Sequence, residues 1–148
     1  MEIGEKDQTS VETENLPELH VLGVEDDPSI RRLQEILFEK IGIDYTSTAN
    51  GQEALERLQK EPNRFNTLFT DYDMPGMNGV ELAQKAKELN PRLAIALITA
   101  RGLDDAELSS FKTQGIDFHL QKPFLVDDLK SLTGQVKDVF SKGNNNEI

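Results

Sequence analysis

The sequence predicts an α/β fold, a doubly wound five-stranded parallel sheet with helices on both faces. Two observations support this fold class. Short apolar stretches alternate along the chain with longer segments that begin at helix-capping residues and carry apolar residues at helical spacing. The stretch from Leu93 to Thr99 is apolar at nearly every position, which is typical of a central strand covered on both faces. Parallel strands need a long crossover between them, and each helix supplies one.

Local signals support the elements in chain order. Pro28 suits the first position of the first helix, directly after an aspartate N-cap. Asn50 and Asn78 each stand three residues before a glutamate, a pattern that starts the second and third helices. Pro62 and Pro91 break the chain after these helices. The strands are predicted at residues 19–24, 43–48, 67–70, 93–99 and 117–122, and the helices at residues 28–40, 51–60, 79–89, 104–114 and 126–140.

The first helix carries several apolar residues. Ile30, Leu33, Ile36 and Leu37 recur at spacings of three and four residues, which bring side chains onto one side of a helix. We expect these four residues to line its buried face.

The length of 148 residues predicts one domain with a single sizeable core. Residues 1–18 contain six acids and one lysine without a regular apolar period, which predicts a disordered acidic tail. The ordered domain is expected at residues 19–141. A frayed end is expected at residues 142–148, where glycine and asparagine are frequent.

The composition excludes several classes of partner and site. Sixteen basic and twenty-seven acidic residues give a net charge of −11, so nucleic acid and anionic membrane surfaces are not expected as partners. Cysteine is absent, which excludes disulfides and thiolate metal sites and fits a reducing compartment. The first eighteen residues lack the pattern of a signal peptide, and no stretch reaches membrane-spanning length. We therefore expect a cytoplasmic protein.

Polar residues stand at the ends of four predicted strands. Glu25 and Asp26 follow the first strand, Asp71 the third, Thr99 ends the fourth, and Lys122 ends the fifth. The carboxyl ends of parallel strands lie at one edge of the sheet, which is where such folds place their sites. Asp71 by itself could be an ordinary solvated turn residue. The convergence of three carboxylates, a hydroxyl and an amine favours a functional site.

Phosphoryl chemistry suits this set of side chains. Two carboxylates about 4 Å apart repel each other by about 4 kcal/mol at an effective dielectric near 20, so a cation is needed among them. Oxygen ligands without cysteine or histidine favour a hard ion such as Mg²⁺. Lys122 and Thr99 would neutralise and hydrogen-bond a phosphoryl group carried on Asp71. A carboxylate nucleophile in this setting would form an acyl phosphate.

These residues resemble the receiver domain of two-component response regulators. Glu25-Asp26 is similar to the acidic pair of that family, Asp71 to its phosphoacceptor, Thr99-Ala100 to its hydroxyl and small neighbour, and Lys122-Pro123-Phe124 to its lysine motif. The spacings of 45 (71 − 26), 28 (99 − 71) and 23 (122 − 99) residues agree as well. The resemblance covers residues 19–140 and implies the flavodoxin-like strand order 2-1-3-4-5.

The resemblance also implies a role for each site residue. Asp26, Asp71 and the backbone carbonyl of Asp73 would bind Mg²⁺ directly, with Glu25 acting through water. Lys122 would contact Asp71 and then the phosphoryl oxygen, and the peptide between Lys122 and Pro123 is often cis. Thr99 would move toward the phosphoryl group and free space for His119 to turn inward, as a population shift between two states.

The function implied is that of a single-domain response regulator. Asp71 would accept a phosphoryl group from a sensor histidine kinase or a histidine phosphotransfer protein and signal through an unknown output protein. Such a chain is a signalling phosphoacceptor that promotes only its own phosphorylation and dephosphorylation. The output face expected from the family is formed by the fourth helix, the fifth strand and the fifth helix. Its candidate residues are Ala106, Leu108, Phe111, His119 and Val126, for which ordinary packing is the alternative, especially for Leu108 and Phe111.

Three positions depart from the family pattern. His119 stands where tyrosine or phenylalanine is frequent, so it is either a switch residue or an exposed strand histidine. Arg101 and Asp73 each lie two residues beyond a site residue, and we hypothesise that they form an ion pair that screens the phosphoryl group from water. Leu125 replaces a polar cap, which could displace the start of the last helix.

Two other classes of protein compete with this interpretation. A haloacid-dehalogenase-like phosphatase would use Asp71 and Asp73 as nucleophile and acid, but that family normally places its Asp-x-Asp strand first. A flavodoxin-like binding module would need a phosphate loop after the first strand, where Glu25, Asp26 and Asp27 would repel phosphate.

Overall fold

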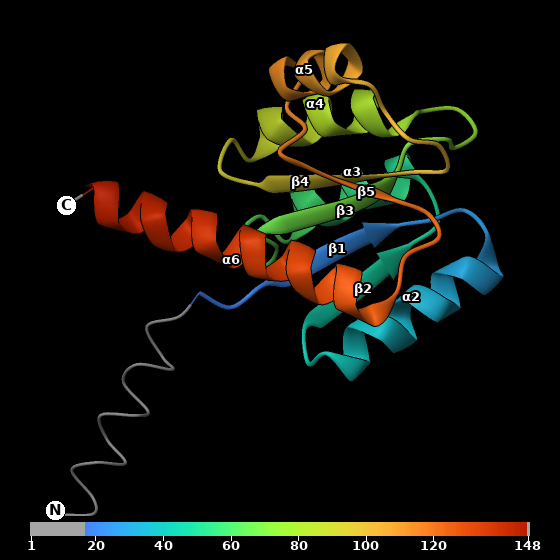
Figure 1. Ribbon diagram of the computed structural model, residues 1–148, viewed down its shortest axis with the longest axis horizontal. Helices are drawn as coiled ribbons and strands as arrows, with labels where there is room; N and C mark the ends of the chain where they lie inside the picture. Colours follow the sequence, from blue (N-terminus) through green and yellow to red (C-terminus); the bar gives the residue numbers. More distant parts are fainter. Residues whose placement is uncertain (1–16, 148) are drawn as a thin grey trace, which may run out of the picture.

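The computed structural model describes residues 17–147 and contains one parallel sheet, with strand order β2-β1-β3-β4-β5 (Figure 1). All neighbouring strands pair in parallel. The strands are β1 (His20–Val24), β2 (Asp44–Thr48), β3 (Thr67–Asp71), β4 (Ala94–Thr99) and β5 (Phe118–Gln121). The predicted fold class and strand order are confirmed. The predicted acidic tail lies outside the described residues except for Pro17 and Glu18.

Helices cover both faces of the sheet (Figure 1). On one face lie α2 (Pro28–Lys40) and α6 (Val126–Glu147), and on the other lie α3 (Gly51–Lys60), α4 (Gly79–Leu89) and α5 (Asp105–Thr113). Successive residues of β4 point alternately into the two cores, so Ile95 and Leu97 pack with α4 while Ala96 and Ile98 pack with α6. All six residues of β4 are buried for this reason.

Most helix starts follow the predicted capping residues. Asp27 accepts hydrogen bonds from the backbone N–H groups of Ser29 and Ile30, and Asn78 and Glu81 form a complete capping box at α4. At α6 the carboxylate of Asp128 accepts the N–H of Leu125 at 2.8 Å. The helix therefore starts at Val126 in spite of the apolar residue before it.

The last helix is longer than the sequence predicts. The pattern places its end near Phe140, whereas α6 continues to Glu147. Two glycines weaken this helix, but no proline follows Pro123 to stop it. No helix within residues 17–147 is both long enough and apolar enough to cross a membrane.

The predicted buried face of α2 is wrong for Leu33 and Ile36, whereas Ile30 and Leu37 are partly buried and Leu37 packs against the core. Leu33 and Ile36 are 54% and 40% exposed, and the buried residues of the helix are Gln34 and Phe38. The ring of Phe38 stacks on Tyr45 with 4.2 Å between centroids and meets Phe69 edge to face. This aromatic packing orients the helix and turns Leu33 toward the surface.

Candidate functional site

The strand register brings the predicted site residues to one edge of the sheet. Val24 pairs with Thr70, Asp71 with Ile98, and Thr99 with Gln121. The carboxyl ends of β1, β3, β4 and β5 therefore lie beside one another, and so do the residues that follow them. The backbone N–H of Lys122 donates to the carbonyl of Thr99 at 2.7 Å, which continues the pairing of β4 and β5 past the end of β5.

Three carboxylates and one ammonium form the centre of this edge. Carboxylate oxygens of Glu25, Asp26 and Asp71 lie within 4.8 Å of one another. Glu25 is 2% exposed and Asp71 is 8% exposed, whereas Asp26 is open to solvent. The Nζ of Lys122 lies 2.9 Å from Oε1 of Glu25 and 3.1 Å from Oδ1 of Asp71. The single ammonium of Lys122 therefore forms ion pairs with two buried carboxylates.

Burial and the neighbouring charges shift two pKa values at this site. Burial raises the pKa of the Asp71 carboxyl; Lys122 opposes that shift, and the charges of Glu25 and Asp26 add to it. Burial would lower the pKa of Lys122, but its bonds to Glu25 and Asp71 outweigh burial, and its pKa is raised. The Lys122 ammonium is thus held in its charged form by the two buried carboxylates.

The donor set fits a hard divalent cation. The clustered groups are carboxylate oxygens, and the exposed position of Asp26 leaves room for water ligands. Glu25 already uses both oxygens, since Oε1 meets Lys122 and Oε2 accepts the N–H of Asp27 at 3.1 Å. Asp26 and Asp71 are therefore the side chains best able to hold an ion directly. Asp73 is exposed on the loop after β3, and a role for its backbone carbonyl stays a prediction.

Thr99 and His119 are brought together at the ends of β4 and β5. The Thr99 side chain is buried, and its hydroxyl donates to the carbonyl of Arg101 at 2.7 Å. The Nε2 atom of His119 lies 3.0 Å from the same hydroxyl. Burial lowers the pKa of His119. The histidine is thus a neighbour of the site and not an exposed strand residue.

The expected ion pair between Arg101 and Asp73 is wrong. The guanidinium of Arg101 makes a two-pronged contact with the carboxylate of Glu107 on α5. Arg101 and the N–H of Asp104 together lower the pKa of Glu107 to about 2. Sequence reasoning missed Glu107, although the spacing of Asp104 and Glu107 is the capping-box pattern that begins α5.

The backbone beside Asp71 is closely packed. A Cβ atom at Gly79 would lie 2.5 Å from the carbonyl oxygen of Asp71 and 2.7 Å from Leu97, so the start of α4 can approach β3 only with glycine there. Tyr72 packs against Phe111 of α5 with 5.9 Å between ring centroids. This contact was also missed, because no short-range pattern connects the two positions. The peptide between Lys122 and Pro123 is cis, as the resemblance implies.

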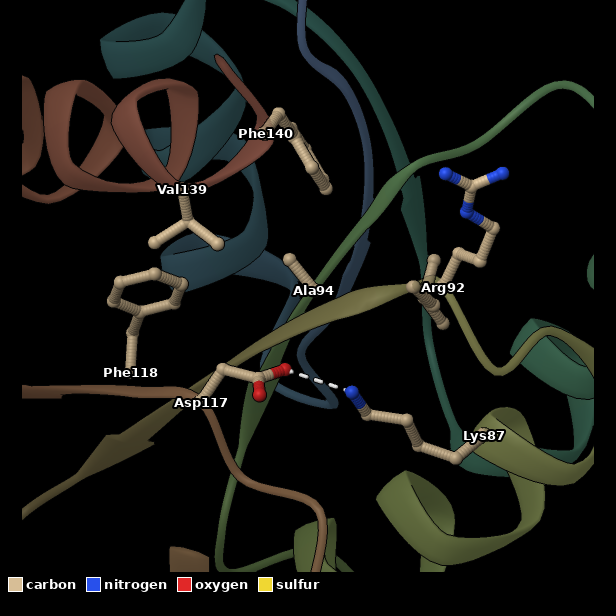
Figure 2. A pocket seen from close by; sticks show the side chains of 8 residues that line it. Lys87, Arg92, Ala94, Asp117, Phe118, Val139 and Phe140 are labelled. Atoms are coloured by element: carbon tan, nitrogen blue, oxygen red, sulfur yellow. Dashed lines mark hydrogen bonds and ion pairs between the residues drawn. The ribbon is translucent and has the colours of Figure 1, made fainter. Parts of the chain in front are cut away.

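Two cavities differ in their relation to the site. One of about 400 Å³ lies at the amino ends of β4 and β5, where the Nζ of Lys87 pairs with Asp117 at 3.0 Å (Figure 2). None of the predicted site residues lines it, because it occupies the opposite edge of the sheet. A second cavity of about 470 Å³ is lined by Asp26, Asn50 and Pro75 among others, so it gives access to the acid cluster.

Comparison with known proteins agrees with this geometry. The family model described as "Response regulator receiver domain" matches residues 21–133. Sporulation initiation phosphotransferase F of Bacillus subtilis is 32% identical over 110 residues, which cover 74% of this chain and 86% of that protein. A receiver protein named CpdR from Brucella abortus is 47% identical over 79 residues, 53% of this chain and 64% of that protein. The match to NtrC of Escherichia coli, at 36% identity, covers 74% of this chain but only 23% of that protein.

Solved structures agree in fold as well. A CheY-like receiver domain protein from Methanospirillum hungatei superposes with a TM-score of 0.75 at 27% identity, over 86% of this chain and 99% of that chain. A chemotaxis protein of Vibrio cholerae gives a TM-score of 0.73 at 27% identity, over 81% and 99%. The phosphatase alternative is not favoured by any of these matches. The chain belongs to the response regulator receiver domain family, whose members are signalling phosphoacceptors.

Proposed function

We propose that this chain acts as the receiver domain of a response regulator in which Asp71 accepts a phosphoryl group in a Mg²⁺-dependent step. The donor is the phosphohistidine of a sensor histidine kinase or of a histidine phosphotransfer protein. One observation carries this proposal: Asp71 lies at the end of β3 in contact with the Lys122 ammonium and close to two further carboxylates. The ammonium of such a site can neutralise a phosphoryl group, and its carboxylates can hold a metal ion.

The transfer reaction is a displacement at phosphorus. An oxygen of Asp71 forms the new P–O bond while the P–N bond to the donor imidazole breaks, and the bonding electrons leave with that nitrogen, which takes up a proton. The product is an acyl phosphate on Asp71. Bound Mg²⁺, held by Asp26 and Asp71, would offset the negative charge that collects on the phosphoryl oxygens.

Lys122 is the residue best placed to stabilise the product. Its ammonium lies 3.1 Å from Oδ1 of Asp71, so a small movement would bring it to a phosphoryl oxygen while it keeps its bond to Glu25. Thr99 would supply a hydroxyl donor after it leaves Arg101. The phosphoryl group thus replaces contacts that the site residues make among themselves.

An apolar groove beside Lys122 supports a protein as the donor. It has a volume of about 200 Å³ and is lined by Leu33, Leu37 and Phe124 next to Lys122. Leu33 is 54% exposed, and the adjacent Leu125 is 73% exposed. A donor protein that presents a histidine to Asp71 would contact this surface, where apolar side chains would add binding energy.

The output partner is proposed to bind the face of α5, β5 and α6. Ala106 is exposed there, and His119 and Val126 are half-buried. Phe111 is assigned to packing instead, since it contacts the core on the α4 side and Tyr72.

The central claim is tested by incubating the protein with Mg²⁺ and acetyl phosphate and measuring intact mass. We expect one phosphoryl adduct in the wild type, none in Asp71→Asn, and a normal adduct in the matched control Asp73→Asn. An adduct that persists in Asp71→Asn would remove the assignment. Repeated turnover of unrelated phosphate esters, lost in Asp73→Asn, would support the phosphatase instead.

A further inference from the structure

The guanidinium of Arg31 reaches from near the start of α2 back to the loop that carries the two acids after β1. Its Nη1 atom donates to the backbone carbonyl of Glu25 at 2.8 Å. In the part of the chain that the structure describes, this carbonyl has no other donor. Glu25 is 2% exposed, so its carbonyl is closed off from solvent and depends on Arg31 for a hydrogen bond.

Three further contacts hold Glu25 in place. Its backbone N–H donates to the carbonyl of Thr48 at 3.1 Å. Its carboxylate meets the Nζ of Lys122 at 2.9 Å and accepts the N–H of Asp27 at 3.1 Å. Arg31 adds the contact that restrains the carbonyl, so both ends of the backbone of this residue are fixed.

The Glu25 carbonyl belongs to the peptide that joins the two acids. A peptide group is planar, so its carbonyl and the Cα atom of Asp26 move together. Without Arg31 the buried carbonyl would lack a donor, and it could regain one only by turning toward solvent. That turn would displace Asp26, the exposed acid that lies with Asp71 in the carboxylate cluster.

We infer that Arg31 is a positioning residue for the proposed magnesium site, because it fixes the peptide between Glu25 and Asp26. The inference rests on the proposed function, in which Asp26 helps to hold the metal ion. An arginine close to several carboxylates commonly forms an ion pair with one of them. Arg31 forms none with the carboxylates of residues 17–147 and donates to a backbone carbonyl instead.

Charge and position predict opposite effects when Arg31 is removed. The guanidinium is a positive charge near an acidic cluster, so loss of the charge alone would strengthen the binding of Mg²⁺. Loss of the contact with the Glu25 carbonyl would weaken that binding, because Asp26 would no longer be held in place. The direction of the change in affinity therefore distinguishes a positioning role from an electrostatic one.

Isothermal titration calorimetry of the unphosphorylated protein with Mg²⁺ measures this direction. Arg31→Met keeps a long side chain and removes the donor, and we expect it to bind Mg²⁺ roughly tenfold more weakly than the wild type. Arg32→Met is the matched control, since it removes the same charge from the next residue, whose side chain is 70% exposed and pairs with Glu35. We expect the control to bind Mg²⁺ as tightly as the wild type or slightly more tightly.

Two further readouts distinguish positioning from a general loss of structure. The rate of phosphorylation by acetyl phosphate should reach half its maximum at a roughly tenfold higher Mg²⁺ concentration in Arg31→Met, with a maximal rate close to that of the wild type. The amide resonance of Asp26, whose N–H shares a peptide with the Glu25 carbonyl, should shift in metal-free Arg31→Met and not in Arg32→Met. Arg31→Gln has a shorter side chain that ends in an amide; it should give the same results, and it replaces Arg31→Met if that variant does not fold.

The outcomes separate the inference from the proposed function. An affinity of Arg31→Met for Mg²⁺ that equals or exceeds that of the wild type would overturn the inference, and so would an equal loss in Arg32→Met. A lower maximal rate with an unchanged requirement for Mg²⁺ would overturn it as well. In each of these cases, phosphorylation of the wild type on Asp71 would uphold the proposed function, whereas a wild type that is not phosphorylated there would refute that function.

Discussion

Replacing Asp71 with asparagine should stabilise the metal-free protein at pH 7, although it removes the proposed phosphoacceptor. Within 4.8 Å, at an effective dielectric near 20, Glu25 and Asp26 each repel the Asp71 carboxylate by about 3.5 kcal/mol. Lys122 at 3.1 Å attracts it by about 5 kcal/mol. The net repulsion of about 2 kcal/mol disappears in Asp71→Asn. We therefore expect the melting temperature to rise by roughly 4–8 °C.

The stability that Asp71→Asn gains over the wild type should increase as the pH rises. Burial, together with Glu25 and Asp26, raises the pKa of Asp71 above its usual value, so the folded protein binds this proton more tightly than the unfolded chain. The wild type thus loses stability as the pH rises from the usual carboxyl range through the raised pKa. The advantage of Asp71→Asn should be absent near pH 3 and complete above the raised pKa.

Urea denaturation between pH 3 and pH 8 with a chelator present is the assay. Asp73→Asn is the matched control, since it removes the same charge from an exposed position two residues away and should change stability by less than about 0.5 kcal/mol. Adding Mg²⁺ should stabilise the wild type more than Asp71→Asn and so narrow the difference. Two results would refute the claim that the Asp71 carboxylate is under net repulsion. One is equal stability of Asp71→Asn and the wild type, and the other is a rise in the stability of Asp73→Asn as large as that of Asp71→Asn.

Other contacts lead to three further predictions. Lys122→Met leaves two buried carboxylates without their ammonium and should lower the free energy of unfolding by about 3 kcal/mol at pH 8 without Mg²⁺, and by less at pH 5; an equal loss at both values would contradict the reason. Gly79→Ala places a methyl group 2.5 Å from the carbonyl oxygen of Asp71 and should cost about 1–3 kcal/mol in urea denaturation. Phe38→Ala should cost about 3–5 kcal/mol, whereas Leu33→Ala should cost less than about 1 kcal/mol; similar losses would contradict the observed orientation of α2.

The set of site residues could be predicted from the sequence because it depends on strand ends and not on side-chain detail. Capping residues such as Asn78 mark where a helix starts, and apolar stretches such as the one before Thr99 mark buried strands. In a parallel sheet every strand carries its carboxyl end to the same edge. Asp26, Asp71 and Lys122 therefore come together whatever the exact packing.

The orientation of α2 could not be predicted in this way. This helix has apolar side chains on several sides, so periodicity alone permits more than one buried face. Stacking of Phe38 on Tyr45, which follows it in the chain on a different element, decides between them. The same rotation exposes Leu33 beside Lys122 and so creates the apolar groove next to the site.

The sequence by itself determined the fold class and the residues that meet at the edge of the sheet, because hydrophobic period, capping and strand parallelism are local or topological properties. Only the tertiary structure decided which partner each polar side chain takes. Arg101 binds Glu107 and not Asp73, and Thr99 is held by His119 and the Arg101 carbonyl. Such pairings depend on side-chain reach and on differences of about one ångström, which no spacing in the sequence encodes.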